Sequence, residues 1–167
     1  MEEIVDACNE ICQLGILEGT DVLYIAKMEP QQAICVNSSV GATLGAYATS
    51  LGKSLLSCYS DDEVRRICPA TFIQYTPKTV KNIDELLAQL DTIRTQGYAL
   101  ENGEVNKDIE CISVPVQVAR QTMAISVSLP IYRSTQEKQA EILALLQQHK
   151  HEIADQTAGL QQDLSFI

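Results

Sequence analysis

The fold is decided by a stretch that reads ECISVPVQV over residues 110–118, ARQT over 119–122 and MAISVSLP over 123–130. Two runs rich in valine and isoleucine flank a short polar break, and this pattern predicts a β-hairpin. Because strand side chains alternate between the two faces of a sheet, Ser126 and Ser128 share one face and the apolar residues between them share the other. We therefore expect the apolar face to form core and the serine face to be small and polar.

The serine face of this hairpin has two interpretations. Ser126 and Ser128 offer two neighbouring hydroxyl groups and leave room over the sheet, and Cys111 begins the partner strand. Such a face can border a small-molecule pocket. Small residues also allow a helix to pack closely on a sheet, and the pattern alone leaves both interpretations open.

Composition limits the class of protein. The chain has 167 residues, is 46% hydrophobic and carries a net charge of −10 at pH 7, so a single domain over residues 1–167 can bury a sizeable core. The negative charge opposes phosphate backbones, and we expect no direct contact between this chain and duplex DNA. No apolar run reaches membrane-spanning length, and the acidic start is unlike a signal peptide. The six cysteines form no C-x-x-C pair, which favours a reducing cytoplasm over a disulfide framework.

Upstream of the hairpin, hydrophobic spacing predicts one helix followed by three strands. Apolar residues recur at helical spacing over 2–14, and Gly15 is expected to end this helix in a left-handed conformation. The predicted strands are residues 21–28, 33–36 and 43–47. Short turns between them imply antiparallel pairing.

Residues 48–56 read ATSLGKSLL and predict a loop that turns into a helix near Ser50. The first N–H groups of a helix have no partner within it and favour an anion. The Gly-Lys-Ser triplet invites comparison with a nucleotide-binding P-loop, but Gly45 lies seven residues before Gly52, whereas that motif needs a spacing of about five. We therefore reject nucleotide binding at this helix.

Three capping boxes mark helix starts in the rest of the chain. Ser60, Asn82 and Ser134 each precede a glutamate by three residues, which is typical of the first turn of a helix. A short strand at 98–100 and a polar loop over 101–108 precede the hairpin. The order of elements predicts one α+β domain with a central antiparallel sheet of about six strands flanked by helices.

Signatures of catalysis are poor. His149 and His151 are the only histidines, lie late in the last predicted helix on different faces, and are expected to be solvated. We therefore predict no catalytic residues, no metal and no cofactor. The polar residues that remain are the hairpin serines, Cys111, the turn at Ser50 and the acidic loop at Glu101. Together they suggest a small pocket that holds an anion without transforming it.

Four motifs follow one another along the chain: LGKSLL at 51–56, TIRTQGYA at 92–99, CISVPV at 111–116 and ISVSLP at 125–130. In this order they resemble the C-terminal effector-binding domain of the isocitrate-lyase-regulator (IclR) family of bacterial transcription factors, over about residues 22–160. The resemblance implies a GAF-like (profilin-like) fold. It also implies a regulator that forms a homodimer or homotetramer and contacts DNA through an N-terminal winged helix-turn-helix domain, which this chain lacks.

The same resemblance implies a pocket for a small organic acid, such as a keto acid, a sugar acid or an aromatic acid. The effector-binding positions of the family fall on Ser50, Leu51, Glu101, Cys111, Ser126 and Ser128. Ser50 and Leu51 would offer backbone N–H groups to a carboxylate, and the two serines of the hairpin would offer it their hydroxyl groups. Glu101 stands where the family often has aspartate, and its longer side chain would place the carboxylate differently.

The sequence thus predicts the ligand-sensing domain of a cytoplasmic transcriptional repressor whose operator binding is controlled by an organic acid. A ligand-free dimerisation or structural module is the first alternative, and it would fill the space between Ser50, Cys111 and Ser128 with side chains. An enzyme acting on a small acid is the second alternative, and a turnover assay with candidate acids would identify it.

Overall fold

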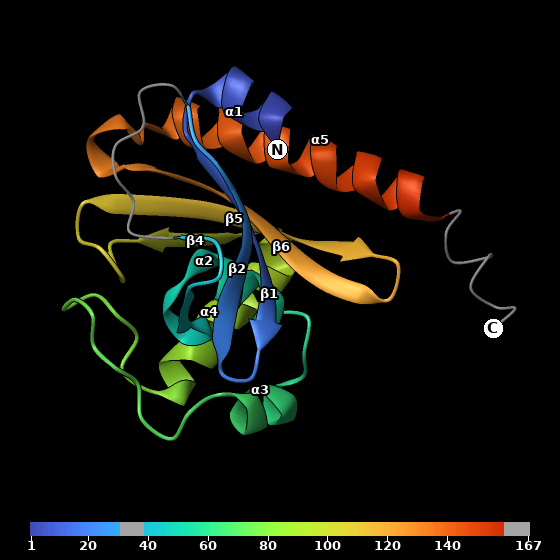
Figure 1. Cartoon of the computed structure of the whole chain (residues 1–167). Coiled ribbons are helices and arrows are strands. Elements are labelled where there is room, and N and C mark those ends of the chain that lie inside the picture. Colours follow the sequence, from blue (N-terminus) through green and yellow to red (C-terminus); the bar gives the residue numbers. More distant parts are fainter. Residues whose placement is uncertain (31–38, 159–167) are drawn as a thin grey trace, which may run out of the picture.

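The computed structural model describes residues 1–30 and 39–158, and over these residues the chain forms a six-stranded antiparallel sheet with helices on both sides (Figure 1). The strand order is β3-β2-β1-β6-β5-β4. The strands are β1 (Ile11–Glu18), β2 (Asp21–Met28), β3 (Thr43–Gly45), β4 (Ala99–Asn102), β5 (Ile109–Val118) and β6 (Gln121–Pro130). The helices are α1 (Glu2–Cys8), α2 (Ser50–Leu56), α3 (Asp61–Ile67), α4 (Ile83–Gln96) and α5 (Gln136–Ala158), with 3-10 turns η1 (Ala46–Ala48) and η2 (Ile131–Arg133). None of the helices in the described ranges is long and apolar enough to cross a membrane.

The predicted hairpin is confirmed as β5 and β6. Val118 pairs with Gln121, so the turn is shorter than the predicted polar break, and it is made possible by Ala119 with φ 52°. On its other side β6 pairs with β1, which places the hairpin in the middle of the sheet. Cys111 lies opposite Ser128 across the hairpin. The serine face of β6 therefore has a neighbouring strand on each side.

The first helix is shorter than predicted, and the remainder of that segment is a strand. The single helix expected over 2–14 is wrong: α1 ends at Cys8, and Asn9 takes the left-handed conformation with φ 56°. Helical spacing continues past this point, but pairing of β1 with both β2 and β6 outweighs the local preference. Gly15 is not a helix cap. It lies in β1 at a bulge, where an added Cβ would stand 2.7 Å from Cγ1 of Val22.

The other strands before α2 agree with the prediction in part. Residues 21–28 are confirmed as β2, and the strand expected over 43–47 is confirmed as the shorter β3, which ends at Gly45. The strand predicted at 33–36 lies outside the described residues. The strand count therefore matches the expected six over the described ranges although one member differs, with β1 in the place of that segment.

The helix starts predicted at Ser60 and Asn82 are confirmed as the caps of α3 and α4. The capping box predicted at Ser134 is wrong, because α5 begins after Thr135, whose hydroxyl oxygen accepts the N–H of Lys138 at 3.2 Å. The hydroxyl of Ser134 donates to the carboxylate of Glu110 on β5 instead. This bond ties the entry of the last helix to the sheet.

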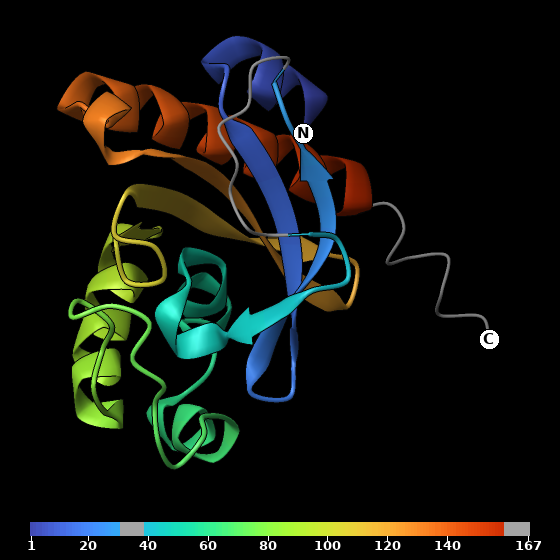
Figure 2. The same ribbon diagram turned by 60° about the vertical axis from the view of Figure 1, so that its left-hand side comes forward.

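Each face of the sheet is covered by its own helices (Figures 1 and 2). α1 and α5 pack on the apolar face of β6, and the core there contains Ile125, Val127, Leu129, Ile142 and Leu146. α2 and α4 cover the opposite face and surround a second apolar core. The serines of β6 lie on this second side, next to α2.

Candidate ligand-binding site

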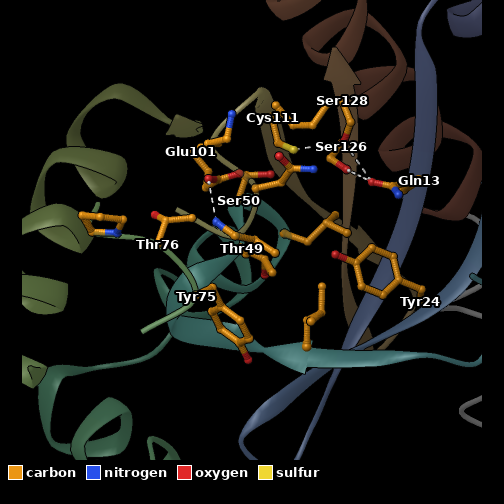
Figure 3. Close-up of a pocket in the computed structure, with 17 residues that line it drawn as sticks. Gln13, Tyr24, Thr49, Ser50, Tyr75, Thr76, Glu101, Cys111, Ser126 and Ser128 are labelled. Carbon is orange, nitrogen blue, oxygen red and sulfur yellow. Dashed lines mark hydrogen bonds between the residues drawn. The ribbon is translucent and has the colours of Figure 1, made fainter. Parts of the chain in front are cut away.

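The serines of β6 belong to a hydrogen-bonded group that spans three adjacent strands (Figure 3). The hydroxyl of Ser128 donates to Oε1 of Gln13 on β1 at 3.0 Å, and that of Ser126 donates to the same atom at 3.5 Å. On the other side, Sγ of Cys111 on β5 lies 3.0 Å from Oγ of Ser128. The register explains the grouping, because Gln13 pairs with Ser126 and Cys111 pairs with Ser128.

The start of α2 lies across from these strands. Thr49 caps the helix through its hydroxyl oxygen, which accepts the N–H of Gly52 at 3.0 Å. Glycine is needed at this position because an added Cβ would stand 2.1 Å from the carbonyl oxygen of Ala46. The N–H groups of Ser50 and Leu51 precede the first intrahelical bond, and within the described residues no protein acceptor is found for either. Both residues are buried, so two donors of buried residues lack a partner within the part of the chain that the structure describes.

A buried cluster of charged groups is formed by residues of β4, the loop that follows it and α2. Glu101 belongs to this strand and not to the predicted loop, and its Oε1 accepts the N–H groups of Glu104 and Val105. Burial, together with the nearby Glu104 carboxylate, raises the pKa of Glu101 to about 7. Lys53 on α2 is fully buried and forms an ion pair with Glu104. Burial lowers the pKa of Lys53, and the carboxylate of Glu104 opposes that shift.

These elements line a partly open cavity of about 480 Å³, a volume that admits a small molecule. The strand group, the start of α2 and Glu101 supply polar groups to it. Most other lining side chains are apolar or aromatic, including Tyr24, Leu44, Tyr75 and Ile109. The cavity thus combines a few placed hydrogen-bonding groups with a largely apolar surround.

All residues predicted to bind the effector line this one cavity: Ser50, Leu51, Glu101, Cys111, Ser126 and Ser128. Their role in binding stays a prediction. Sequence reasoning missed Gln13 because it placed this residue in a helix. Its own position, as a polar residue between the apolar Cys12 and Leu14, was the available sign of a strand. Sequence reasoning also missed the burial of Lys53, for which the apolar residues on both sides of the Gly-Lys-Ser triplet were the available sign.

The cavity offers groups for binding, but no activated nucleophile is found in it among the described residues. Burial and the Glu101 carboxylate raise the pKa of Cys111 well above its ordinary value, so the thiol stays protonated at neutral pH. The histidines lie on α5, across the sheet. His151 is exposed as predicted, whereas His149 is not solvated: its side chain is 12% exposed, with Nδ1 2.8 Å from a carboxylate oxygen of Glu152.

Among the described residues, one group of side chains has the donor atoms for a metal ion. Glu3, His149 and Glu152 bring one ligand atom each to within 4.8 Å of one another, between α1 and α5. Both glutamates are exposed, and the group lies on the opposite side of the sheet from the cavity. It therefore has no part in the cavity's chemistry.

Comparison with known proteins identifies the family to which this fold and cavity belong. Residues 1–155 match the family model described as bacterial transcriptional regulator IclR C-terminal. The chain belongs to the IclR family, which confirms the resemblance carried by the four sequence motifs. Solved structures of IclR C-terminal domains share the fold, and the predicted GAF-like α+β class is confirmed.

Three similar proteins show the extent of the match. The HTH-type transcriptional regulator KdgR of Dickeya chrysanthemi is 31% identical over 159 residues, which are 93% of this chain and 52% of KdgR. The solved C-terminal domain of Escherichia coli KdgR has a TM-score of 0.84 and 29% identity, covering 94% of this chain and 93% of that domain. The inducer-binding domain of PobR from Acinetobacter, solved as a double mutant with 3-hydroxybenzoic acid, has a TM-score of 0.80 and 25% identity, covering 90% and 91%. The chain spans about half the length of the curated relatives it matches.

Proposed function

We propose that this domain senses a small organic acid, and that the acid bound in the cavity controls operator binding by the regulator to which the domain belongs. One observation carries the proposal: a partly open cavity of about 480 Å³ is lined by Ser50 and Leu51, two buried residues whose N–H groups have no protein acceptor among the described residues. A carboxylate supplies such acceptors, and hydrogen bonds to a charged group are the stronger ones. The complex of the PobR domain with a hydroxybenzoic acid supports an acid as the class of effector.

The other predicted residues contact the remainder of the acid. Ser126 and Ser128 were expected to donate to the carboxylate, but both hydroxyl groups donate to Gln13. We therefore assign them, with Cys111 and Glu101, to the end of the acid that is remote from its carboxylate. All six predicted effector-binding residues are therefore kept in the proposal. Only the part of the acid that the two serines contact differs from the sequence-based prediction.

The alternatives receive less support. A ligand-free structural module would fill the space between Ser50, Cys111 and Ser128, and that space is a cavity. An enzyme acting on a small acid finds no activated thiol in Cys111. The relatives are named as transcriptional regulators.

For the full regulator we propose a cytoplasmic repressor that assembles as a homodimer or homotetramer. Its DNA contacts would come from a separate helix-turn-helix domain, because the relatives are HTH-type regulators about twice as long as their match to this chain. The net charge of −10 on the present chain favours that division of labour.

The test is a thermal-shift screen of this chain against organic acids, followed by calorimetry. An acid that binds only the folded state adds about 2.7 kcal/mol of stability at a hundredfold excess over Kd. Ser128→Ala and Ser126→Ala should each weaken binding about threefold to tenfold, the loss expected for a hydrogen bond to a neutral group of the ligand. Ser57→Ala is the matched control, because its hydroxyl donates to the carbonyl of Ser54 outside the cavity.

Two outcomes would overturn the proposal. If no acid in the screen stabilises the domain, acid sensing is wrong. If an acid binds and both cavity variants bind it as tightly as the wild-type protein and the Ser57→Ala control, the acid is held at another place and the assignment of the site is wrong.

A further inference from the structure

Gln13 occupies a position in the cavity for which neither the motifs nor the comparisons assign a role. It comes from β1, is 3% exposed, and lies directly opposite Ser126 in the sheet. Its Oε1 is the shared acceptor of the hydroxyl hydrogens of Ser126 and Ser128. In Figure 3 this oxygen points toward the two serines and into the lined space. One carboxamide therefore sets the direction of both hydroxyl groups.

The direction of a hydroxyl decides what it offers a ligand. A serine hydroxyl has one hydrogen to donate and two lone pairs that accept. While Ser126 and Ser128 donate to Gln13, their oxygens have only lone pairs to offer a ligand, and one of those on Ser128 accepts the thiol hydrogen of Cys111, whose Sγ lies 3.0 Å away. This end of the cavity is therefore matched to a ligand group that donates a hydrogen bond.

The end of the cavity at Ser126 and Ser128 has no buried, unpaired cation among the described residues that could bind an anion. Lys53 on α2 is not among the residues that line the cavity, and it is paired with Glu104. Among the described residues that line the cavity, Lys107 is the only cationic one, its side chain is 79% exposed, and its ammonium lies 3.0 Å from Asp108. A second carboxylate placed there would face lone pairs without a counter-charge. A ligand hydroxyl would donate to the same lone pairs.

We propose that Gln13 is a specificity-determining residue, and that the acid recognised is a monocarboxylic acid with a hydroxyl group at its far end, donated to Ser126 or Ser128. The inference rests on the proposed function, because it takes the binding of an organic acid in this cavity as given. It adds which acids are accepted and which residue excludes the dicarboxylic ones.

The test uses two pairs of acids in which a hydroxyl-bearing end is replaced by a carboxylate. These are 4-hydroxybenzoate with terephthalate, and gluconate with glucarate. Calorimetry at one pH and ionic strength gives the ratio of affinities within each pair. For at least one pair, the wild-type domain should bind the hydroxylated monoacid about tenfold or more tightly than the diacid.

Two variants separate specificity from structure. Gln13→Met keeps the length of the side chain and removes the acceptor, so the serine hydroxyls can turn and donate to a ligand carboxylate. The preference for the monoacid should fall about tenfold. Gln13→Glu retains acceptor oxygens for both serines and should keep the preference for the monoacid. A residue with only a structural role would weaken both members of a pair equally and leave their ratio unchanged.

The outcomes distinguish this inference from the function on which it rests. Equal or tighter binding of the diacids by the wild-type domain overturns the inference and leaves acid sensing in place, as does a ratio that Gln13→Met leaves unchanged. Absence of binding by all four acids, when another acid in the screen binds, also overturns it. Absence of binding across the whole screen overturns the proposed function. If Gln13→Met does not fold, as judged by its melting curve, the wild-type ratio decides.

Discussion

The two faces of β6 share one backbone and differ in the kind of side chain that each face buries. On one face Ile125, Val127 and Leu129 are packed against α5 with nothing polar to partner. On the other face Ser126 and Ser128 are equally buried but border a cavity. The comparison teaches that burial alone does not identify a site. What distinguishes the second face is a set of buried polar groups arranged around space that the protein does not fill.

The largest predicted effect is on the cavity side, where the Lys53–Glu104 pair is buried. Lys53→Met should lower the free energy of unfolding by about 3–5 kcal/mol, because it leaves the Glu104 carboxylate buried without its partner. Urea unfolding at neutral pH measures the loss. The double variant Lys53→Met with Glu104→Gln should recover most of it, and equal losses in the single and double variants would contradict this account.

On the apolar face of β6, which packs against α5, Leu146→Ala should lower the free energy of unfolding by about 2–5 kcal/mol, because the substitution leaves a cavity in the core. Leu146 is fully buried on α5, across the sheet from the candidate site. Acid affinity, measured by calorimetry well below the melting temperature, should be unchanged. The exposed Gln147→Ala on the same helix is the control, with an expected effect within about 0.5 kcal/mol. A large loss of affinity in Leu146→Ala would show that the two faces are coupled.

The cavity side should also make stability depend on pH through Glu101. Its pKa is raised from 4.5 to about 7 on folding, so the folded state holds a proton that the unfolded state releases between these values. Stability therefore falls as pH rises through this window, by on the order of 2–3 kcal/mol between pH 5 and 8. Glu101→Gln keeps an acceptor for the N–H groups of Glu104 and Val105 and should remove this part of the dependence. Urea unfolding at both pH values measures it, and identical pH profiles for the two proteins would be the contrary result.

The smallest effect is expected far from the site, at the start of α4. Asn82→Ala removes the side-chain oxygen that accepts the N–H of Glu85 at 2.9 Å and should lower the free energy of unfolding by about 1 kcal/mol. Lys81→Ala, just outside the helix, should change it by less than about 0.5 kcal/mol. Thermal unfolding of both variants gives the comparison. Acid binding should be the same in both, since α4 contributes no residue to the cavity lining.

Sequence reasoning succeeded where the deciding signal is local. Alternation within β5 and β6 gave the hairpin and the serine face, and capping residues gave the starts of α3 and α4. It failed where the deciding contact is distant along the chain. No sequence pattern near Gln13 predicts that it pairs with Ser126, and none near Lys53 predicts its ion pair with Glu104. Five of the six predicted cavity residues were already singled out by the pattern of polar residues, and the family resemblance added Leu51 and an expected role for each, which periodicity cannot supply.

The three consecutive residues Gly-Lys-Ser at 52–54 each lie against a different part of the chain. The glycine passes the backbone of Ala46, the lysine pairs with Glu104, and the serine Oγ lies 2.7 Å from that of Ser113. A saturation library over these codons, sorted only for folded protein, should therefore return few amino acids at each position. A motif search for this triplet would mistake a constraint on folding for a nucleotide-binding signature. In this domain the amino acids tolerated at the three positions are set by size, charge and hydrogen bonding inside the protein.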